Sequence, residues 1–132
     1  MKPETNPITN TIIETAVKTL DEKKAQDIRL IRVRDLTIIS DYFLIASGTS
    51  STQVKSLADE LEERLGQLGI QPHHIEGKAS GWILLDYNTV TIHVFHAQQR
   101  EFYSLERLWS DGEDVDLSDY IDEVSTQHET GI

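Results

Sequence analysis

Two apolar runs separated by only two residues constrain the fold of this chain more than any other feature. The runs are Gly81–Tyr87 and Val90–Phe95, and Asn88-Thr89 lies between them. Both runs are rich in β-branched and aromatic residues, which is typical of strands, and Asn tolerates the left-handed backbone of a tight turn. The spacing therefore predicts an antiparallel hairpin whose turn is either Asn88-Thr89 or the four residues from Tyr87 to Val90, with one register in both cases.

The register of this hairpin divides its side chains between two faces. Because successive strand residues point to opposite sides, one face is almost uniformly apolar and predicts a core. Its members are Ile83, Leu85, Tyr87, Val90, Ile92 and Val94. The other face holds the cross-strand pairs Trp82 with Phe95, Leu84 with His93, and Asp86 with Thr91. This second face is aromatic at one end and polar at the other, so we expect either a helix of the same chain or a partner protein to cover it.

A helix is predicted directly after the hairpin, over Gln98–Trp109. Its apolar residues repeat with helical spacing and form one stripe, made of Phe102, Leu105, Leu108 and Trp109. A second stripe, made of Arg100, Tyr103 and Arg107, is either a solvated helix face or part of an interface. Trp, Tyr and Arg most often carry interface energy. We therefore predict a partner-binding patch of Trp82, His93, Phe95, Arg100 and Tyr103, with Trp82 as its strongest member.

The rest of the chain alternates between helix and strand patterns. Residues 1–10 are polar and are expected to be flexible, and Thr9, Asn10 or Thr11 is expected to cap a helix that runs to about Lys24. A second helix is predicted from Ser51 or Thr52 to about Leu68, with Gly69 as its C-cap. Further strands are predicted at Ile28–Val33, Tyr42–Ala46 and His74–Glu76. The order predicts a single compact α/β domain, with a mixed sheet of about five strands flanked by helices.

Acidic residues outnumber basic residues, most strongly at the end of the chain. The net charge is −11, and residues 110–132 hold eight acidic residues and no Lys or Arg, which leaves −3 for residues 1–109. Phosphate binding relies on Lys and Arg, so this balance argues against direct binding to DNA or RNA and fits a basic protein partner. Residues 112–132 have few apolar side chains, and we expect them to form a disordered acidic tail that is dispensable for folding.

The small-residue turn Ser47–Ser51 is the one place that invites comparison with a phosphate-binding loop. It joins a predicted strand to a predicted helix, but it has no Lys-Ser/Thr pair and no glycine triplet. The pattern therefore favours a simple helix cap, with Gly48 supplying an unusual backbone angle. Metal-dependent nucleotidyl transfer would need paired carboxylates on a strand, but none of the strands predicted after Gly48 carries an Asp-x-Asp pair, and Asp35, Asp41 and Asp86 are single.

No metal, cofactor or membrane is predicted as a partner. The chain has no Cys, and His93 and His96 lie three residues apart on one strand and therefore face opposite sides. No apolar run approaches the roughly 20 residues that a membrane-spanning helix needs. The N-terminus lacks the apolar stretch of a signal peptide, so we expect a soluble cytoplasmic protein.

Two long segments of the chain resemble the ribosomal silencing factor family, also called RsfS or Iojap. They read SDYFLIASGTSSTQVKSLADELEERL and GWILLDYNTVTIHVFHAQQREFYSLERLW, and the resemblance covers residues 11–111. The chain departs from the family pattern at Asn88-Thr89, where members usually carry Gly-Asp, and this concerns only the hairpin turn. We therefore expect a family domain at residues 11–111, between the flexible residues 1–10 and the acidic tail 112–132.

The resemblance implies a fold related to that of nucleotidyltransferases and a function in translation without catalysis. It implies binding to the large ribosomal subunit through ribosomal protein fourteen, at the face where the two subunits join. A protein bound there would block the small subunit and repress translation under nutrient limitation. The alternative is a metal-dependent nucleotidyltransferase-like enzyme, and whether the chain forms a homodimer remains open.

Overall fold

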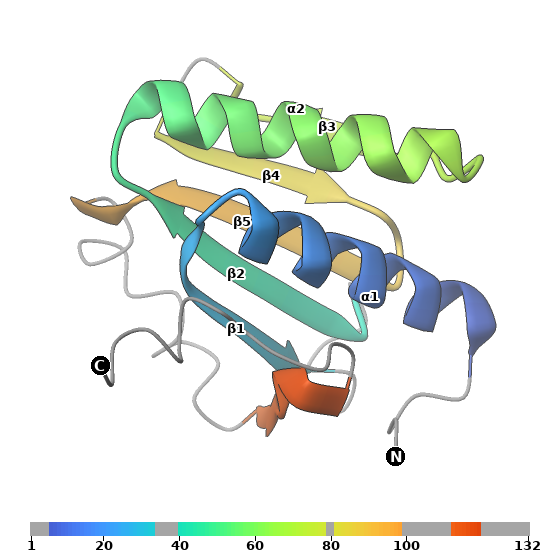
Figure 1. Ribbon diagram of the computed structural model, residues 1–132. Coiled ribbons are helices and arrows are strands. Elements are labelled where there is room, and N and C mark those ends of the chain that lie inside the picture. Colours follow the sequence, from blue (N-terminus) through green and yellow to red (C-terminus); the bar gives the residue numbers. More distant parts are fainter. Residues whose placement is uncertain (1–5, 34–39, 79–80, 99–111, 120–132) are drawn as a thin grey trace.

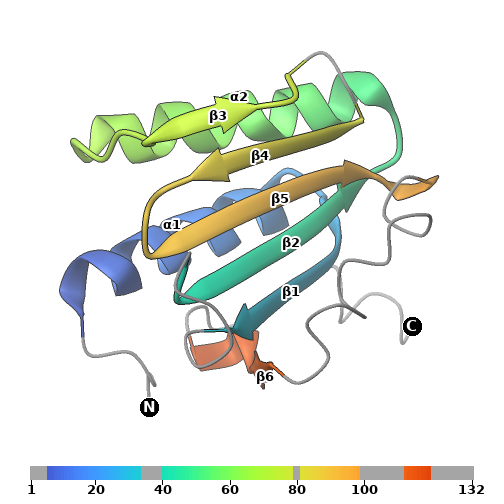
Figure 2. The same ribbon diagram turned by 180° about the vertical axis from the view of Figure 1, so that it is seen from behind.

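Two helices pack on one face of a sheet in the computed structural model, which describes residues 6–33, 40–78, 81–98 and 112–119 (Figures 1 and 2). The described helices are α1 Pro7–Glu22, α2 Ser51–Gln67 and the short 3-10 helix η1 Leu117–Asp119. The strands are β1 Gln26–Arg32, β2 Tyr42–Gly48, β3 His74–Glu76, β4 Trp82–Asp86, β5 Val90–His96 and β6 Glu113–Val115. The predicted α/β domain with a mixed sheet and flanking helices is confirmed.

The sheet runs in the order β3-β4-β5-β2-β1-β6. Strands β2 and β5 are parallel, and every other pair of neighbours is antiparallel. Strand β2 lies in the interior of the sheet and all seven of its residues are buried. This position explains its continuous apolar run, because a strand covered on both faces needs no polar alternation.

Helix α1 begins earlier than its sequence pattern predicted. The side chain of Asn6 caps it by accepting hydrogen bonds from the amides of Ile8 and Thr9, and Pro7 occupies the first turn. Asn is among the best N-cap residues and Pro suits the first helical position, so the Asn-Pro pair sets the boundary. Residues 7–10, which were expected to be flexible, are therefore helical.

Helix α2 begins and ends close to its predicted limits. Ser50 is the N-cap, and its hydroxyl oxygen accepts a hydrogen bond from the Gln53 amide at 3.1 Å. Gly69 follows the helix with a φ of 80°, in the left-handed region that a helix C-terminus favours. The interpretation of the small-residue turn as a helix cap is confirmed.

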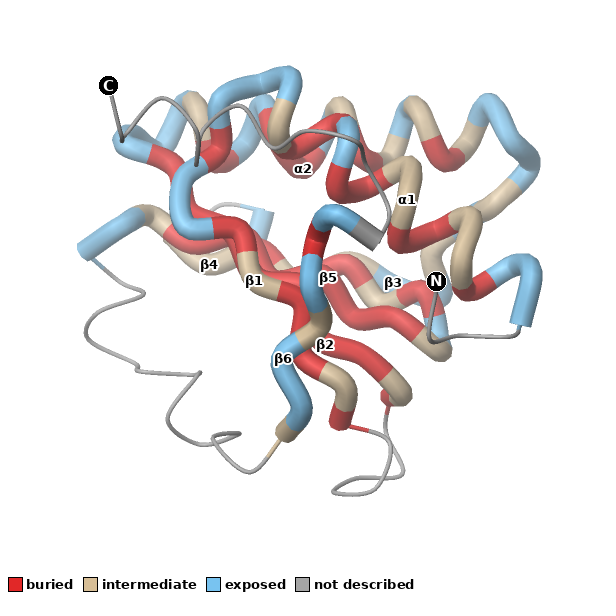
Figure 3. Tube along the Cα trace, turned by 60° about the horizontal axis from the view of Figure 1, so that its bottom comes forward, coloured by how far each residue is buried: buried red, intermediate tan, exposed pale blue. Residues whose placement is uncertain are grey.

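One large core fills the space between the helices and the sheet. The predicted core face of the hairpin is correct, because all six of its residues are at most 4% exposed and belong to this core. The buried stripes of α1 and α2 complete it, as Figure 3 shows by the buried segments of both helices and of the central strands. The hairpin turn spans four residues, with the Tyr87 amide donating to the Val90 carbonyl and Asn88 at a φ of 75°.

The start of the acidic tail contributes to the fold, contrary to the expected disorder of residues 112–132. Strand β6 pairs with β1 and adds a sixth strand to the expected five. Asp114 accepts a hydrogen bond from Arg29 at 2.6 Å, and Leu117 is 7% exposed in the large core. Composition alone does not reveal this segment, because Arg29 and Arg32 of β1 pair with its carboxylates and only Val115 and Leu117 of its described residues contact the core.

Three other predictions concern residues that the structure does not describe. They are the predicted helix Gln98–Trp109 beyond its first residue, the carboxylate Asp35, and the remainder of the tail at residues 120–132.

Candidate protein-binding surface

The sheet face opposite α1 and α2 carries a second and smaller apolar cluster. Its buried members are Ile31, Val33, Phe43, Ile45 and Phe95, and Trp82 packs against them. This is the mixed face predicted for the hairpin, because β4 and β5 pair in the predicted register, with Trp82 opposite Phe95. Both described long helices lie on the other side of the sheet (Figures 1 and 2).

Three aromatic side chains pack around Trp82. Its indole stacks on Phe95 with ring centroids 4.8 Å apart and an interplanar angle of 21°. Its Nε1–H group donates a hydrogen bond to Nδ1 of His93 over 3.2 Å. The His93 ring in turn meets Phe43 in an edge arrangement, with centroids 4.9 Å apart and an angle of 68°. Such T-shaped and stacked contacts are favoured geometries of aromatic pairs and stabilise the cluster beyond the area that they bury.

The described residues of the predicted patch differ in how far they are buried. Phe95 is fully buried and His93 is 4% exposed, whereas Trp82 keeps part of its surface accessible. Arg100 and Tyr103 lie outside the described residues. The structure therefore brings together Trp82, His93 and Phe95, but it gives them different positions: Trp82 lies at the surface, and the other two lie beneath it.

Strand β3 supplies surface neighbours that the sequence pattern did not identify. Directly paired residues of antiparallel strands project to the same side, so His74 shares a face with Asp86 and Glu76 shares it with Leu84. The His74 ring contacts both carboxylates, with Nε2 3.0 Å from Glu76 Oε2 and Nδ1 3.5 Å from Asp86 Oδ2. We call Trp82, Leu84, Asp86, His74 and Glu76 the β3–β4 surface. It combines an accessible apolar strip with an acidic rim.

His93 is a neutral hydrogen-bond acceptor in this cluster. Burial lowers the pKa of its imidazole from 6.5 to about 4, so the ring is uncharged at neutral pH. Because Nδ1 accepts from the Trp82 indole, the ring proton resides on Nε2. Within the described part of the chain, Nε2 is buried and has no hydrogen-bond partner.

The polar end of the mixed face is closed by internal hydrogen bonds. Thr91 Oγ1 donates to Ser40 Oγ at 3.1 Å, and Ser40 Oγ donates to the Tyr42 carbonyl at 3.1 Å. Both hydroxyl side chains belong to buried residues. Thr91 therefore holds the connection that precedes β2 rather than a partner, and no local sequence pattern predicts this long-range pair.

Internal contacts hold the turn that was compared with a phosphate-binding loop. Gly48 does not adopt the predicted unusual angle; instead, a Cβ there would approach Val54 Cγ2 to 3.0 Å, so glycine allows close packing between β2 and α2. Gln53 Oε1 accepts hydrogen bonds from the Thr49 amide and hydroxyl, so these two donors of the turn are used within the protein. In the ranges that the structure describes, no three His, Asp or Glu residues could hold a metal ion, and no helix could span a membrane.

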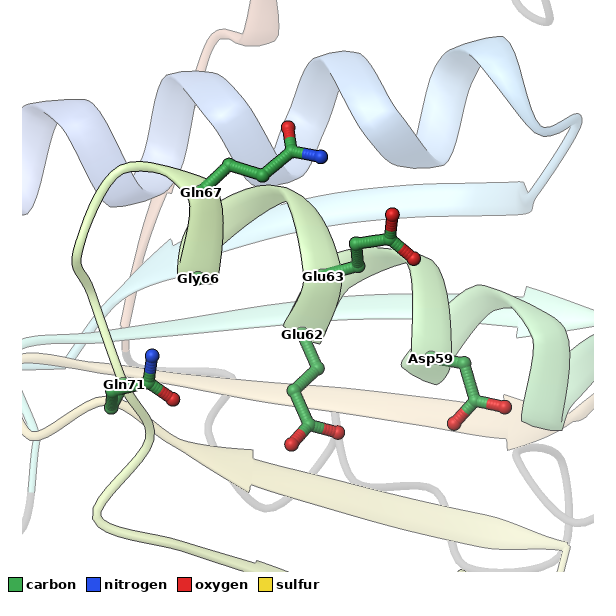
Figure 4. Close-up of a pocket in the computed structure, with 6 residues that line it drawn as sticks. All are labelled: Asp59, Glu62, Glu63, Gly66, Gln67 and Gln71. Atoms are coloured by element: carbon green, nitrogen blue, oxygen red, sulfur yellow. The ribbon is translucent and has the colours of Figure 1, made fainter.

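An open depression on the outer side of α2 is acidic rather than apolar. It has a volume of about 540 Å³ and is lined by Asp59, Glu62, Glu63, Gly66, Gln67 and Gln71 (Figure 4). Lys78 reaches it from outside the lining, with Nζ 3.3 Å from Glu62 Oε1. With no apolar side chain in its lining, the depression lacks the features of a small-molecule pocket and adds negative charge to this side of the molecule.

Comparison with known proteins supports the resemblance in the sequence. The family model described as "Ribosomal silencing factor during starvation" matches residues 6–131, beyond both limits of the expected 11–111 domain. Ribosomal silencing factor RsfS of Halalkalibacterium halodurans is 36% identical over 111 residues, which cover 83% of this chain and 95% of that protein. A mouse protein named mitochondrial assembly of ribosomal large subunit protein 1 is 34% identical over 102 residues, covering 74% of this chain and 45% of its own length.

The fold is also that of a solved relative. A crystal structure of a Chromobacterium violaceum protein matches with a TM-score of 0.73 and 31% sequence identity, covering 76% of this chain and 84% of that chain. The family model, the curated relative and the solved structure each cover at least three quarters of the chain. The chain therefore belongs to the ribosomal silencing factor family.

Proposed function

We propose that this protein binds the large ribosomal subunit through ribosomal protein fourteen and blocks joining of the small subunit. Bound in this way in the cytoplasm, it represses translation when nutrients are scarce. Family membership supports the proposal, and so does the name of the mouse relative, which refers to assembly of a ribosomal large subunit. A steric mechanism of this kind requires a binding surface and no catalytic group.

The β3–β4 surface is the observation that carries the proposal. Trp82 and Leu84 present partly accessible apolar area on a sheet face that neither α1 nor α2 covers. Truncating a tryptophan at the centre of an interface often costs about 2 kcal/mol or more of binding free energy. Interfaces place such apolar anchors inside a polar rim, which Glu76, Asp86 and His74 provide here.

Charge supports a basic protein as the partner. The rim carboxylates, the acidic depression on α2 and the net charge of −11 all give this protein a negative potential. Opposite charge on a partner raises the rate of encounter and disfavours acidic competitors, including exposed RNA phosphates. A ribosomal protein with Lys and Arg around an apolar patch fits this combination.

Co-sedimentation tests the proposal. We expect the protein to be recovered with purified large subunits and not with joined ribosomes, and to reduce subunit joining in sucrose gradients. Trp82→Ala should weaken recovery. Leu68→Ala is the matched control, because Leu68 is an apolar side chain that is 55% exposed and lies at the end of α2, outside the β3–β4 surface. Equal recovery with large subunits and with joined ribosomes would contradict the blocking mechanism.

The alternative function, metal-dependent nucleotidyl transfer, has a simple test of its own. An enzyme of that class must bind nucleotide with Mg²⁺, and ligand binding to the folded state raises the melting temperature. We expect nucleotides plus Mg²⁺ to leave the melting temperature unchanged. A concentration-dependent rise would favour the enzyme.

A further inference from the structure

We propose that His93 is a positioning residue that holds the Trp82 indole with its N–H group directed into the protein and its hydrocarbon edge toward the partner. The inference rests on the proposed binding role of the β3–β4 surface. The inference also gives the chemistry of the site on the partner that receives Trp82. That site should be apolar and should need no hydrogen-bond acceptor for the indole N–H group.

The direction of the N–H group follows from where its acceptor lies. Trp82 Nε1 is 3.2 Å from His93 Nδ1, and His93 is 4% exposed. The polar atom of the indole therefore turns toward a buried group, while Trp82 itself remains partly accessible. The accessible part of the ring is then carbon, which contributes to binding through apolar contact rather than hydrogen bonding.

Contacts on both sides hold this orientation. Phe95 stacks on the indole at 4.8 Å, which restrains rotation of the ring out of the stack. Phe43 packs against His93 at 4.9 Å, and the strand pairing of Leu84 with His93 places the imidazole next to Trp82 along the hairpin. An interface residue held in its bound conformation loses less conformational entropy on binding, which favours affinity.

The neutral state of His93 makes it an acceptor. A protonated imidazole carries N–H groups at both ring nitrogens, and its Nδ1–H would face the indole N–H as a second donor. Burial keeps the ring neutral at pH 7, so Nδ1 retains its lone pair. Phe or Leu would fill a similar space but would leave the indole N–H without its acceptor. The physical role of histidine here is thus distinct from filling the cluster.

Two substitutions of His93 separate positioning from packing. His93→Asn keeps an acceptor, because the Asn side-chain oxygen can occupy the place of Nδ1, whereas His93→Leu removes it. The first measurement is the indole ¹H–¹⁵N NMR signal of Trp82 in the free protein, assigned by its absence from Trp82→Phe. In His93→Leu we expect this signal to move upfield and to exchange faster with water, and His93→Asn should restore it.

The second measurement is affinity for purified large ribosomal subunits by co-sedimentation. Losing one hydrogen bond of ordinary strength should weaken binding by His93→Leu about fivefold, and His93→Asn should regain most of it. An unchanged indole signal in His93→Leu would overturn the inference, and so would a freed indole with unchanged affinity. If His93→Leu does not fold, His93→Gln replaces it. The Gln side chain is one methylene longer than that of Asn, so its oxygen lies beyond the place of Nδ1 and does not reproduce the acceptor.

These outcomes are distinct from failure of the proposed function. The NMR measurement uses the free protein and does not depend on the ribosome. If Trp82→Ala binds large subunits as tightly as the unmodified protein, the proposed surface is wrong whatever the indole signal shows. If Trp82→Ala binds weakly and His93→Leu binds normally, only the positioning role is wrong.

Discussion

Trp82 and Phe95 face each other across the β4–β5 hairpin, and their rings stack with centroids 4.8 Å apart. Phe95 is fully buried in the smaller cluster, whereas Trp82 packs on its margin and remains partly accessible. One cross-strand pair therefore joins the interior of the sheet to the surface that we propose for binding. The two residues should respond differently to truncation.

Trp82→Ala should impair binding more than folding. We expect it to lower the affinity for large subunits by about 2 kcal/mol or more, as at a binding hot spot. Phe95→Ala should instead lower the free energy of unfolding by ~3–5 kcal/mol, because it empties a fully buried site. Urea unfolding and large-subunit affinity should be measured on the same preparations. A strongly destabilised Trp82→Ala whose folded fraction binds normally would show that Trp82 is a core residue.

Acid should destabilise the protein through His93. Its pKa is about 4 in the folded state and 6.5 as the reference value, so the unfolded chain takes up the proton first as pH falls. The free energy of unfolding should therefore fall between pH 6.5 and pH 4, with His93 contributing ~3 kcal/mol to the loss. His93→Asn should flatten this part of the profile, measured by urea unfolding at several pH values. If the unfolding free energies of the unmodified protein and of His93→Asn fell in parallel as the pH is lowered, His93 would not be a buried neutral imidazole.

Leu117→Ala should destabilise the fold although Leu117 lies in an acidic segment. Its side chain is 7% exposed and belongs to the large core, so truncation should cost ~2 kcal/mol. Deleting residues 112–132 should cost more, because it also removes the pairing of β6 with β1. Glu63→Ala, at an exposed position of α2, is the control and should stay within ~0.5 kcal/mol. The stability of the two substituted proteins and of the truncated protein should be measured by thermal and urea unfolding. A truncated protein as stable as the full chain would show that residues 112–132 are dispensable for folding.

Gly48→Ala and Gly66→Ala should have opposite effects on stability. A Cβ at Gly48 would lie 3.0 Å from Val54 Cγ2 and 3.2 Å from the Val54 amide nitrogen, so crowding should cost ~1–3 kcal/mol. At Gly66 a Cβ would meet only Gln71 Nε2, at 3.6 Å, and alanine should stabilise the helix by up to about 1 kcal/mol. Unfolding free energies in urea provide the test. Stabilisation by Gly48→Ala would show that β2 and α2 have room to separate.

Local patterns in the sequence determined the elements and the register of the hairpin. Alternation in strands β4 and β5 placed Ile83 and Val94 on the core face and Trp82 opposite Phe95, and the structure confirms both. The limits predicted for the second helix agree with α2 to within a residue, and Gly69 marked its end. These features are predictable because each depends on residues that are near one another in the chain or joined by a short turn.

Only the tertiary structure decided which side chains of the mixed face are accessible. The strand order places β5 next to β2 and β3 next to β4, and this buries His93 beneath Trp82 while leaving His74 and Glu76 exposed. The strand order also pairs β6 with β1. Arg29 donates a hydrogen bond to Asp114 there, and Leu117 is buried in the large core. Such contacts join residues far apart in sequence, and their free energy comes from burial and charge pairing that no local pattern contains.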